Sequence, residues 1–136
     1  MLQQSEFWEH CLHTIKTRHS LALLLVVDSK GSSPGKAGAK MVVAADGNHL
    51  GTIGGGQVEY NLTQQALALL QQPGSCTRLF YEQHNSSEQV CGGMQTVLYY
   101  QCNKADLAVL QDIQFAFQHK QPMQLCIILA WMDIKK

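Results

Sequence analysis

Three short segments hold the residues of this chain whose types and spacing could do chemistry. They are the glycine motif Gly51–Glu59 (GTIGGGQVE), the serine loop Asp28–Gly38 (DSKGSSPGKAG) and the motif Cys91–Gly93 (CGG). Glycine lets the backbone adopt positive φ or approach a ligand closely. Serine hydroxyls and lysine cations suit an oxyanion, and a thiolate is a nucleophile and a ligand for soft metals. The chemistry to consider is the binding of an anionic ligand, with a thiol as a further reactive group.

The glycine loop, Gly54–Gly56, joins an apolar segment to a helical pattern. Apolar residues follow it at helical spacing, at Val58, Leu62, Ala66, Leu69 and Leu70, which predicts strand, loop and helix. Amides at the N-terminus of such a helix face whatever lies over the loop, so the loop could cradle the phosphate of a cofactor. The alternative is a tight turn that lets strand and helix pack closely, and the glycines alone do not decide between the two. The G-x-G-x-x-G spacing is absent, and no Walker lysine follows.

The polar residues of the three segments each have two interpretations. Glu59 complements the dipole of the predicted helix, and its place beside the glycine loop also suits a contact to a ligand's donor groups. Ser32, Ser33 and Lys36 follow a predicted central strand, where open α/β sheets bind ligands, although a flexible surface loop has the same composition. Cys91 fits a small apolar residue in a tight bulge, or an exposed thiolate if nearby groups favour its charged form.

Composition narrows the class of protein. The 136 residues suffice for one domain with its own core, and ten Lys plus Arg balance ten Asp plus Glu, which leaves no basic surface for nucleic acid. The longest apolar runs, Leu21–Val27 and Leu125–Met132, are shorter than the ~20 residues of a membrane span, and the N-terminus shows no export signal. We therefore expect a cytoplasmic protein without nucleic-acid or membrane partners, with five free cysteines and no zinc site.

The apolar periodicity predicts an α/β fold with a single domain over residues 1–136. Helices are expected at about Ser5–Arg18, Gln57–Gln71 and Leu107–Phe117, and strands at Leu21–Val27, Ala39–Ala45, Leu50–Ile53, Cys76–Glu82, Gln95–Gln101 and Gln124–Trp131. Ser5 is the expected N-cap of the first helix, Asp46-Gly47 predicts a hairpin turn, and Gln83–Val90 predicts a loop. Because the expected order is helix, strand, hairpin, helix, two strands, helix and strand, we expect a mixed sheet with about three flanking helices.

The three motifs, in this order, resemble the N-terminal domain of the XdhC/CoxI family, the xanthine dehydrogenase accessory factors. The matching stretches are GSSPGKAGAKMVV (Gly31–Val43), DGNHLGTIGGGQVE (Asp46–Glu59) and CGG (Cys91–Gly93). The resemblance implies a cytoplasmic chaperone that binds molybdenum cofactor (molybdopterin) and helps to mature and insert it into a molybdenum hydroxylase such as xanthine dehydrogenase. It leaves a homo-oligomer open. Family members commonly carry a second, Rossmann-like domain, and we expect none in this chain before Lys136.

The resemblance also implies roles for the candidate residues. The cofactor-binding set is Ser32, Ser33, Lys36, Gly54, Gly55, Gly56, Gln57, Glu59, Cys91, Gly92 and Gly93. In this set the three glycines of the glycine loop hold the phosphate, and Ser32, Ser33 and Lys36 line the opposite wall. No residue is expected to bind a metal ion directly, and Cys91 approaches the metal only through the bound cofactor. Many family members have Cys where this chain has Gln57, so thiol chemistry at that position does not carry over. The family also often has Arg or Lys directly after Ser-Pro, where this chain has Gly35.

Catalysis is not required for the accessory role. The main alternative is a small oxidoreductase or transferase that binds a nucleotide-like phosphate ligand, with Cys91 as nucleophile and Glu59 as base. A second alternative is an interaction module in which the glycine-rich segments only pack. Molybdenum and pterin in the purified protein would separate these classes.

Overall fold

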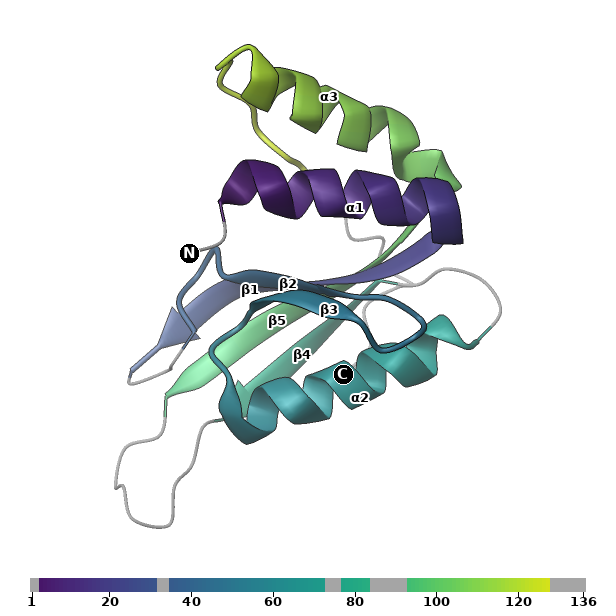
Figure 1. The fold of residues 1–136 in the computed structure, drawn as a ribbon. Helices are drawn as coiled ribbons and strands as arrows, with labels where there is room; N and C mark the ends of the chain where they lie inside the picture. The colour runs from purple at the N-terminus through teal and green to yellow at the C-terminus, as the bar shows by residue number, and fades with distance from the viewer. Residues whose placement is uncertain (1–2, 32–34, 73–76, 84–92, 128–136) are drawn as a thin grey trace.

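The part of the chain that the structure describes folds into a five-stranded sheet with helices on both faces. The computed structural model describes residues 3–31, 35–72, 77–83 and 93–127. Within them the elements are α1 (Gln4–Arg18), β1 (Ser20–Lys30), β2 (Lys40–Val43), β3 (His49–Thr52), α2 (Gly56–Leu70), β4 (Thr77–Gln83), β5 (Met94–Asn103), a short 3-10 turn η1 (Lys104–Asp106) and α3 (Leu107–Gln118). Helix α1 covers one face of the sheet, α3 packs against α1 on the same side, and α2 covers the other face (Figure 1). The predicted α/β class, with a hairpin and three helices, is confirmed.

Strand β1 lies in the middle of the sheet, whose order is β3-β2-β1-β5-β4. Successive side chains of a strand point to opposite faces, so Leu23 is buried against α1 and Leu24 is buried on the α2 face. This confirms the predicted central strand at Leu21–Val27. The strand continues to Lys30, where the sequence predicted irregular structure, because a register shift just after Val26 lets it keep pairing with β5.

Every strand pairing among the described residues is antiparallel, whereas the sequence predicted a mixed sheet. Strands β2 and β3 form the predicted hairpin around Asp46-Gly47. Helix α2 then carries the chain from β3, at one edge of the sheet, to β4, at the opposite edge (Figure 1). The two strands that α2 joins run in the same direction but are separated by β2, β1 and β5. A helical connection therefore creates no parallel neighbours here.

Strands β4 and β5 lie where the sequence predicted strands, although Gln83 ends β4 and does not begin a loop. Residues 32–34 and 84–92 lie outside the described part of the chain. The predictions for Ser32, Ser33, Cys91 and Gly92 fall on these residues. No described helix has both the length and the apolar content that crossing a membrane requires.

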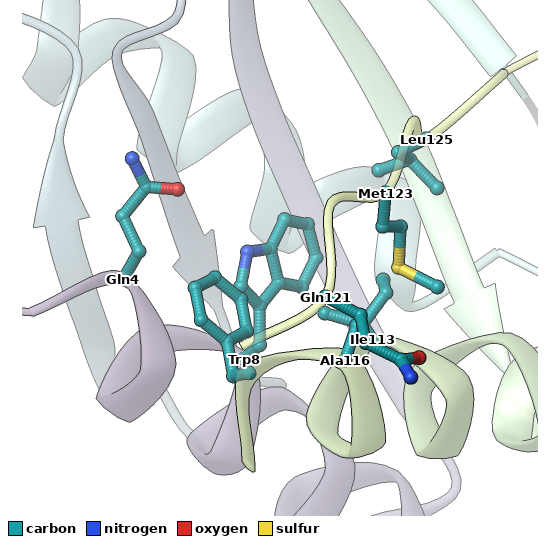
Figure 2. Close-up of a pocket in the computed structure, with 8 residues that line it drawn as sticks. Gln4, Trp8, Ile113, Ala116, Gln121, Met123 and Leu125 are labelled. Atoms are coloured by element: carbon teal, nitrogen blue, oxygen red, sulfur yellow. The ribbon is translucent and has the colours of Figure 1, made fainter. Parts of the chain in front are cut away.

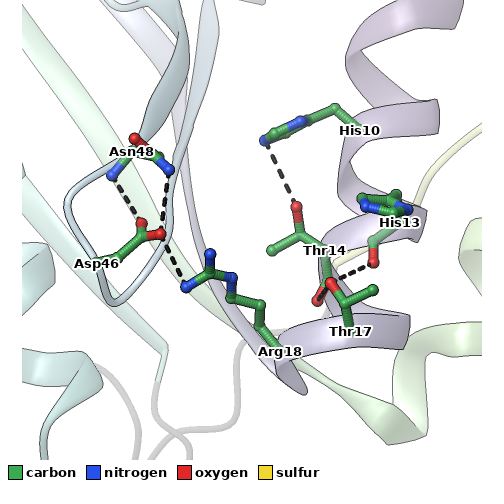
Figure 3. Close-up of polar contacts among 7 residues, drawn as sticks. All are labelled: His10, His13, Thr14, Thr17, Arg18, Asp46 and Asn48. Carbon is green, nitrogen blue, oxygen red and sulfur yellow. Dashed lines mark hydrogen bonds and ion pairs between the residues drawn. The ribbon is translucent and has the colours of Figure 1, made fainter.

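Helix α1 packs on the sheet and is tied to the hairpin turn. Its buried apolar residues are Phe7, Trp8, Cys11, Leu12 and Ile15. The predicted N-cap was wrong, because the helix already begins at Gln4 and has no side-chain cap. At its other end, Nη1 of Arg18 lies 2.8 Å from Oδ2 of Asp46, whose Oδ1 accepts a hydrogen bond from the backbone N–H of Asn48 (Figure 3). This contact holds the far end of the hairpin, away from the glycine loop.

The predicted last strand was wrong for the part that the structure describes, because residues 124–127 belong to no strand. The rest of Gln124–Trp131 lies outside the described residues. Met123 and Leu125 instead line a pocket of about 300 Å³ with Trp8 of α1 and Ile113 of α3 (Figure 2). The apolar side chains at this point therefore pack against helix side chains. They do not belong to a strand that pairs with the sheet.

Candidate functional site

The glycine loop has a backbone that only glycine adopts readily. The φ angles of Gly54, Gly55 and Gly56 are 122°, 80° and 71°, and the ψ of Gly55 is −169°. Side chains of L-residues are strained in this region. A Cβ added at Gly55 or Gly56 would meet no heavy atom within 4 Å. Gly55 and Gly56 are therefore required by the conformation of the loop and not by crowding, and the space beside these two residues is open.

Glu59 braces this loop from the first turns of α2. Its Oε1 accepts hydrogen bonds from Oγ1 of Thr52 at 2.6 Å, from the backbone N–H of Ile53 at 2.9 Å and from that of Gly55 at 3.0 Å. The N–H of Gly54 donates to Oγ1 of Thr52 at 3.0 Å. The N–H groups of Gly54 and Gly55, which the sequence predicted to bind phosphate, thus donate to the side chains of Thr52 and Glu59 instead.

The donors that remain for an anion are the first N–H groups of α2, from Gly56 onward. The first N–H groups of a helix have no partner within the helix, and α2 has no side-chain cap hydrogen bond. Gln57 lies here too, but its exposed side chain donates from Nε2 to Oδ1 of Asn61 at 2.8 Å, one turn along the helix. Both predicted interpretations of the glycine loop therefore have support at different residues, with a tight turn at Gly54 and Gly55 and an anion-competent terminus after them.

Hydrogen bonding keeps the Glu59 carboxylate charged. Partial burial raises the pKa of Glu59, but the hydrogen bonds from Thr52, Ile53 and Gly55, and then the nearby His49, lower it, and the net pKa is below its ordinary value. A carboxylate with a lowered pKa is a weaker base than an unperturbed one. This argues for a structural role of Glu59 and against the proton-accepting role that the enzyme alternative assigned to it.

A side chain that the sequence analysis did not single out joins the segments. Gln95 of β5 is 1% exposed, and its Nε2 donates to the carbonyl oxygens of Ile53 at 2.8 Å and Gly35 at 3.2 Å. Ile53 precedes the glycine loop, Gly35 belongs to the serine loop, and Gln95 follows the CGG motif by two residues. Gly35 of the serine loop and Ile53 of the glycine motif therefore meet Gln95, which follows the CGG motif in the chain, at one end of the sheet. The sequence held one signal for the burial of Gln95. Side chains alternate between the two faces of a strand, which puts Gln95 on the same inward face of β5 as Val97.

The other predicted site residues lie around this point. Lys36 is exposed and follows the buried Gly35. Gly93 is buried and precedes Met94, which pairs with Lys30 at the end of β1. The ends of β1 and β5 thus bring the start of the serine loop next to Gly93. Ser32, Ser33, Cys91 and Gly92 lie outside the described residues.

The described cysteines are free thiols and stand apart from this end of the sheet. Cys11 and Cys102 are buried in the core between α1, α3 and the sheet, and Cys126 is exposed. Burial raises the pKa of Cys11 to about 12 and also raises the pKa of Cys102. Both are therefore inert thiols at neutral pH. Within the described ranges, no cluster of three or more His, Cys, Asp or Glu side chains could hold a metal ion.

The fold and the loop together define a small α/β domain in which Gly35 of the serine loop lies beside the residue that precedes the glycine loop, at one end of an antiparallel sheet. The model of the XdhC and CoxI family matches residues 14–81, half of the chain, and the chain belongs to this family. The matched region contains the serine loop and the glycine motif, and it ends before Cys91–Gly93. The recognition made from the motifs is thus confirmed.

Two similar proteins are much longer than this chain. It is 41% identical over 81 residues to the uncharacterized protein YqeB from Escherichia coli K12, covering 56% of this chain and 14% of YqeB. It also resembles a crystal structure described as a xanthine dehydrogenase from Bacillus halodurans, with a TM-score of 0.60 and 25% identity, covering 82% of this chain and 34% of that one. The chain spans about a third or less of the length of either protein.

The brace predicts an acid-dependent loss of stability. Replacing Glu59 by Ala removes three hydrogen bonds to a charged acceptor and should lower the free energy of unfolding by about 1–3 kcal/mol, toward the lower end because solvent reaches the carboxylate. Since the folded pKa is lowered, the contribution of Glu59 is present above its unfolded pKa of about 4.3 and is lost as the pH falls through the folded value. Urea denaturation at a series of pH values measures both effects.

Two variants serve as references for this measurement. Glu59→Gln keeps an acceptor but loses the charge, so it should be more stable than Glu59→Ala and should flatten the acid limb of the pH profile. Glu9→Gln changes an exposed carboxylate on α1 and should leave that limb unchanged. If the stability of Glu59→Gln fell as steeply at acid pH as that of the parent, the stabilising role of the charged Glu59 carboxylate would be contradicted.

Proposed function

We propose that this domain binds molybdenum cofactor and acts as an accessory protein for a molybdenum hydroxylase of the xanthine dehydrogenase type. Membership of the XdhC and CoxI family and the likeness to a structure described as a xanthine dehydrogenase support a role tied to that enzyme. Maturing the cofactor or inserting it into the client is the finer part of the proposal. The proposed location is the cytoplasm.

The observation that carries the proposal is the braced glycine loop at the start of α2. A ligand phosphate needs N–H donors and positive charge, and helix N-termini that follow glycine turns supply the donors. Here these donors are the N–H groups from Gly56 onward, with open space beside the loop. Lys36 supplies a cation from the serine loop, which Gln95 attaches to the residue before the glycine loop. This donor set fits the phosphate end of a pterin cofactor.

The residues of the domain have binding roles in this proposal. The start of α2 and Lys36 hold the phosphate, and Glu59 keeps the loop in a fixed shape without touching the ligand. Cys91 is assigned to the metal end, where a thiolate is a suitable soft ligand. The bound cofactor supplies the redox chemistry of the client enzyme, and the domain has only to hold and release it.

Replacing Gly55 by Val should weaken cofactor binding by about five- to 150-fold, because a β-branched residue is strained at a φ of 80° and a ψ of −169°, which costs about 1–3 kcal/mol or displaces the loop. The matched control is Gly47→Val in the hairpin turn, which also has a positive φ of 91° and open space around it. Anaerobic titration with molybdenum cofactor released from a purified hydroxylase, followed by pterin fluorescence, measures the affinity of variants shown to be folded. Equal affinities for the two variants would sink the assignment of the loop to the phosphate.

Alkylation of the cysteines separates the accessory role from the enzyme alternative. We expect Cys91 to react with iodoacetamide faster than Cys102 and to be protected when cofactor is added. Cys126 is exposed and should react with or without cofactor, whereas Cys11 and Cys102 should stay unmodified in the folded protein because burial raises their pKa. Mass spectrometry at each site over a range of pH gives the rates. Equal rates at Cys91 and Cys102, without protection, would remove Cys91 from the site, and a covalent substrate adduct on Cys91 would favour the enzyme.

A further inference from the structure

We propose that Gln95 is a positioning residue that sets the distance between the two loops of the cofactor site. The inference rests on the proposed function, and it assigns a role to a side chain outside the glycine and serine motifs. Gln95 lies on β5, which is the strand between β1 and β4. Its amide reaches the residue before the glycine loop and a residue of the serine loop, which are 42 and 60 positions away in the sequence.

The burial of Gln95 requires such partners. At 1% exposure its amide is removed from water on the α2 face of the sheet, beside the core residues Val97 and Tyr99 of the same strand. Burying an amide costs free energy unless hydrogen bonds replace those to water. A side-chain amide has two N–H donors, and Nε2 makes two hydrogen bonds, to Ile53 and to Gly35. An apolar residue of similar size would leave two inward-facing carbonyl groups without this donor.

The serine loop approaches this point as closely as a backbone can. A Cβ added at Gly35 would overlap the carbonyl oxygen of Ile53 and the Nε2 atom of Gln95. Gly35 is itself buried. Glycine is therefore needed at this position because of space, in contrast to Gly55, where it is needed because of φ. The two loops therefore approach each other closely at Gly35 and Ile53, and the Gln95 amide bridges their carbonyl oxygens.

The two residues that Gln95 joins lie close in the chain to the two groups that the proposal gives to the phosphate. Ile53 is three residues before Gly56, where the donors of α2 begin, and Gly35 directly precedes Lys36. Between Ile53 and α2 the chain is held by the Glu59 brace, so a displacement of Ile53 is transmitted to the start of the helix. Gln95 thus acts on the ligand through both loops and without touching it.

The test replaces Gln95 by Met, which has a similar length and no N–H donor. The control is Gln101→Met on the same strand and the same face, where Gln101 is 8% exposed and accepts a hydrogen bond from the hydroxyl of Tyr99. Hydrogen–deuterium exchange of peptides covering residues 35–39 and 53–57 reports the opening of the two loops. Titration with molybdenum cofactor released anaerobically from a purified hydroxylase reports the affinity.

Gln95→Met should speed exchange in both peptides and weaken cofactor binding, each by about tenfold, as expected for the loss of a buried hydrogen-bond donor. Gln101→Met should leave both readouts near the parent values, even if it lowers overall stability to a similar extent. Gly35→Ala leaves residue 95 unchanged but places a Cβ where Nε2 of Gln95 and the carbonyl oxygen of Ile53 now lie, so it should give the same two changes. It therefore decides the matter if Gln95→Met does not fold.

The outcomes distinguish this inference from the proposed function. If the parent binds cofactor and Gln95→Met binds it equally well, or if exchange in the two loops is unchanged, Gln95 is not a positioning residue. If the parent binds no cofactor, the proposed function fails, while the exchange comparison still decides whether Gln95 holds the loops together.

Discussion

The hydrogen bonds accepted by one carboxylate oxygen fix the glycine loop, and the rest of the candidate site depends on that loop. Three successive residues have positive φ, a conformation with a large entropic cost for the chain. Hydrogen bonds that Oε1 of Glu59 accepts from Thr52, Ile53 and Gly55 help to offset this cost. As a result α2 begins at one defined place beside β3, and its first N–H groups have a fixed position.

A loop held in this way suits binding more than catalysis. A preorganised site loses little conformational freedom when the ligand arrives, so more of the interaction free energy appears as affinity. The Glu59 carboxylate, which the enzyme alternative uses as a base, already accepts three hydrogen bonds within the protein and has a lowered pKa. The buried amide of Gln95 extends the same principle to the serine loop, since it joins that loop to the residue before the glycine loop. These contacts favour the proposed binding role over the alternative in which Glu59 acts as a base.

Sequence patterns predicted the elements that depend on local signals. The apolar run of β1, the Asp46-Gly47 hairpin and the helical spacing after the glycine loop each gave the correct element. Strand directions were not predictable, because nothing local to α2 tells that it joins opposite edges of the sheet. Within the candidate site, the glycines were found by type, whereas the role of Gln95 depends on contacts 42 and 60 residues away that no local pattern contains. The brace by Glu59 was missed because a first-turn carboxylate has a sufficient explanation in the helix dipole.

The claim that the domain binds molybdenum cofactor is tested most directly by measuring bound molybdenum and pterin. The protein is purified without oxygen from cells that make molybdenum hydroxylases. Molybdenum is determined by elemental analysis and pterin by fluorescence of its oxidised form, both relative to protein. A domain that binds the cofactor should contain molybdenum and pterin in equal amounts. Both should be lost together in Gly55→Val and retained in Gly47→Val. Protein that contains neither, and that takes up no cofactor when mixed anaerobically with a cofactor-loaded hydroxylase, would contradict the claim.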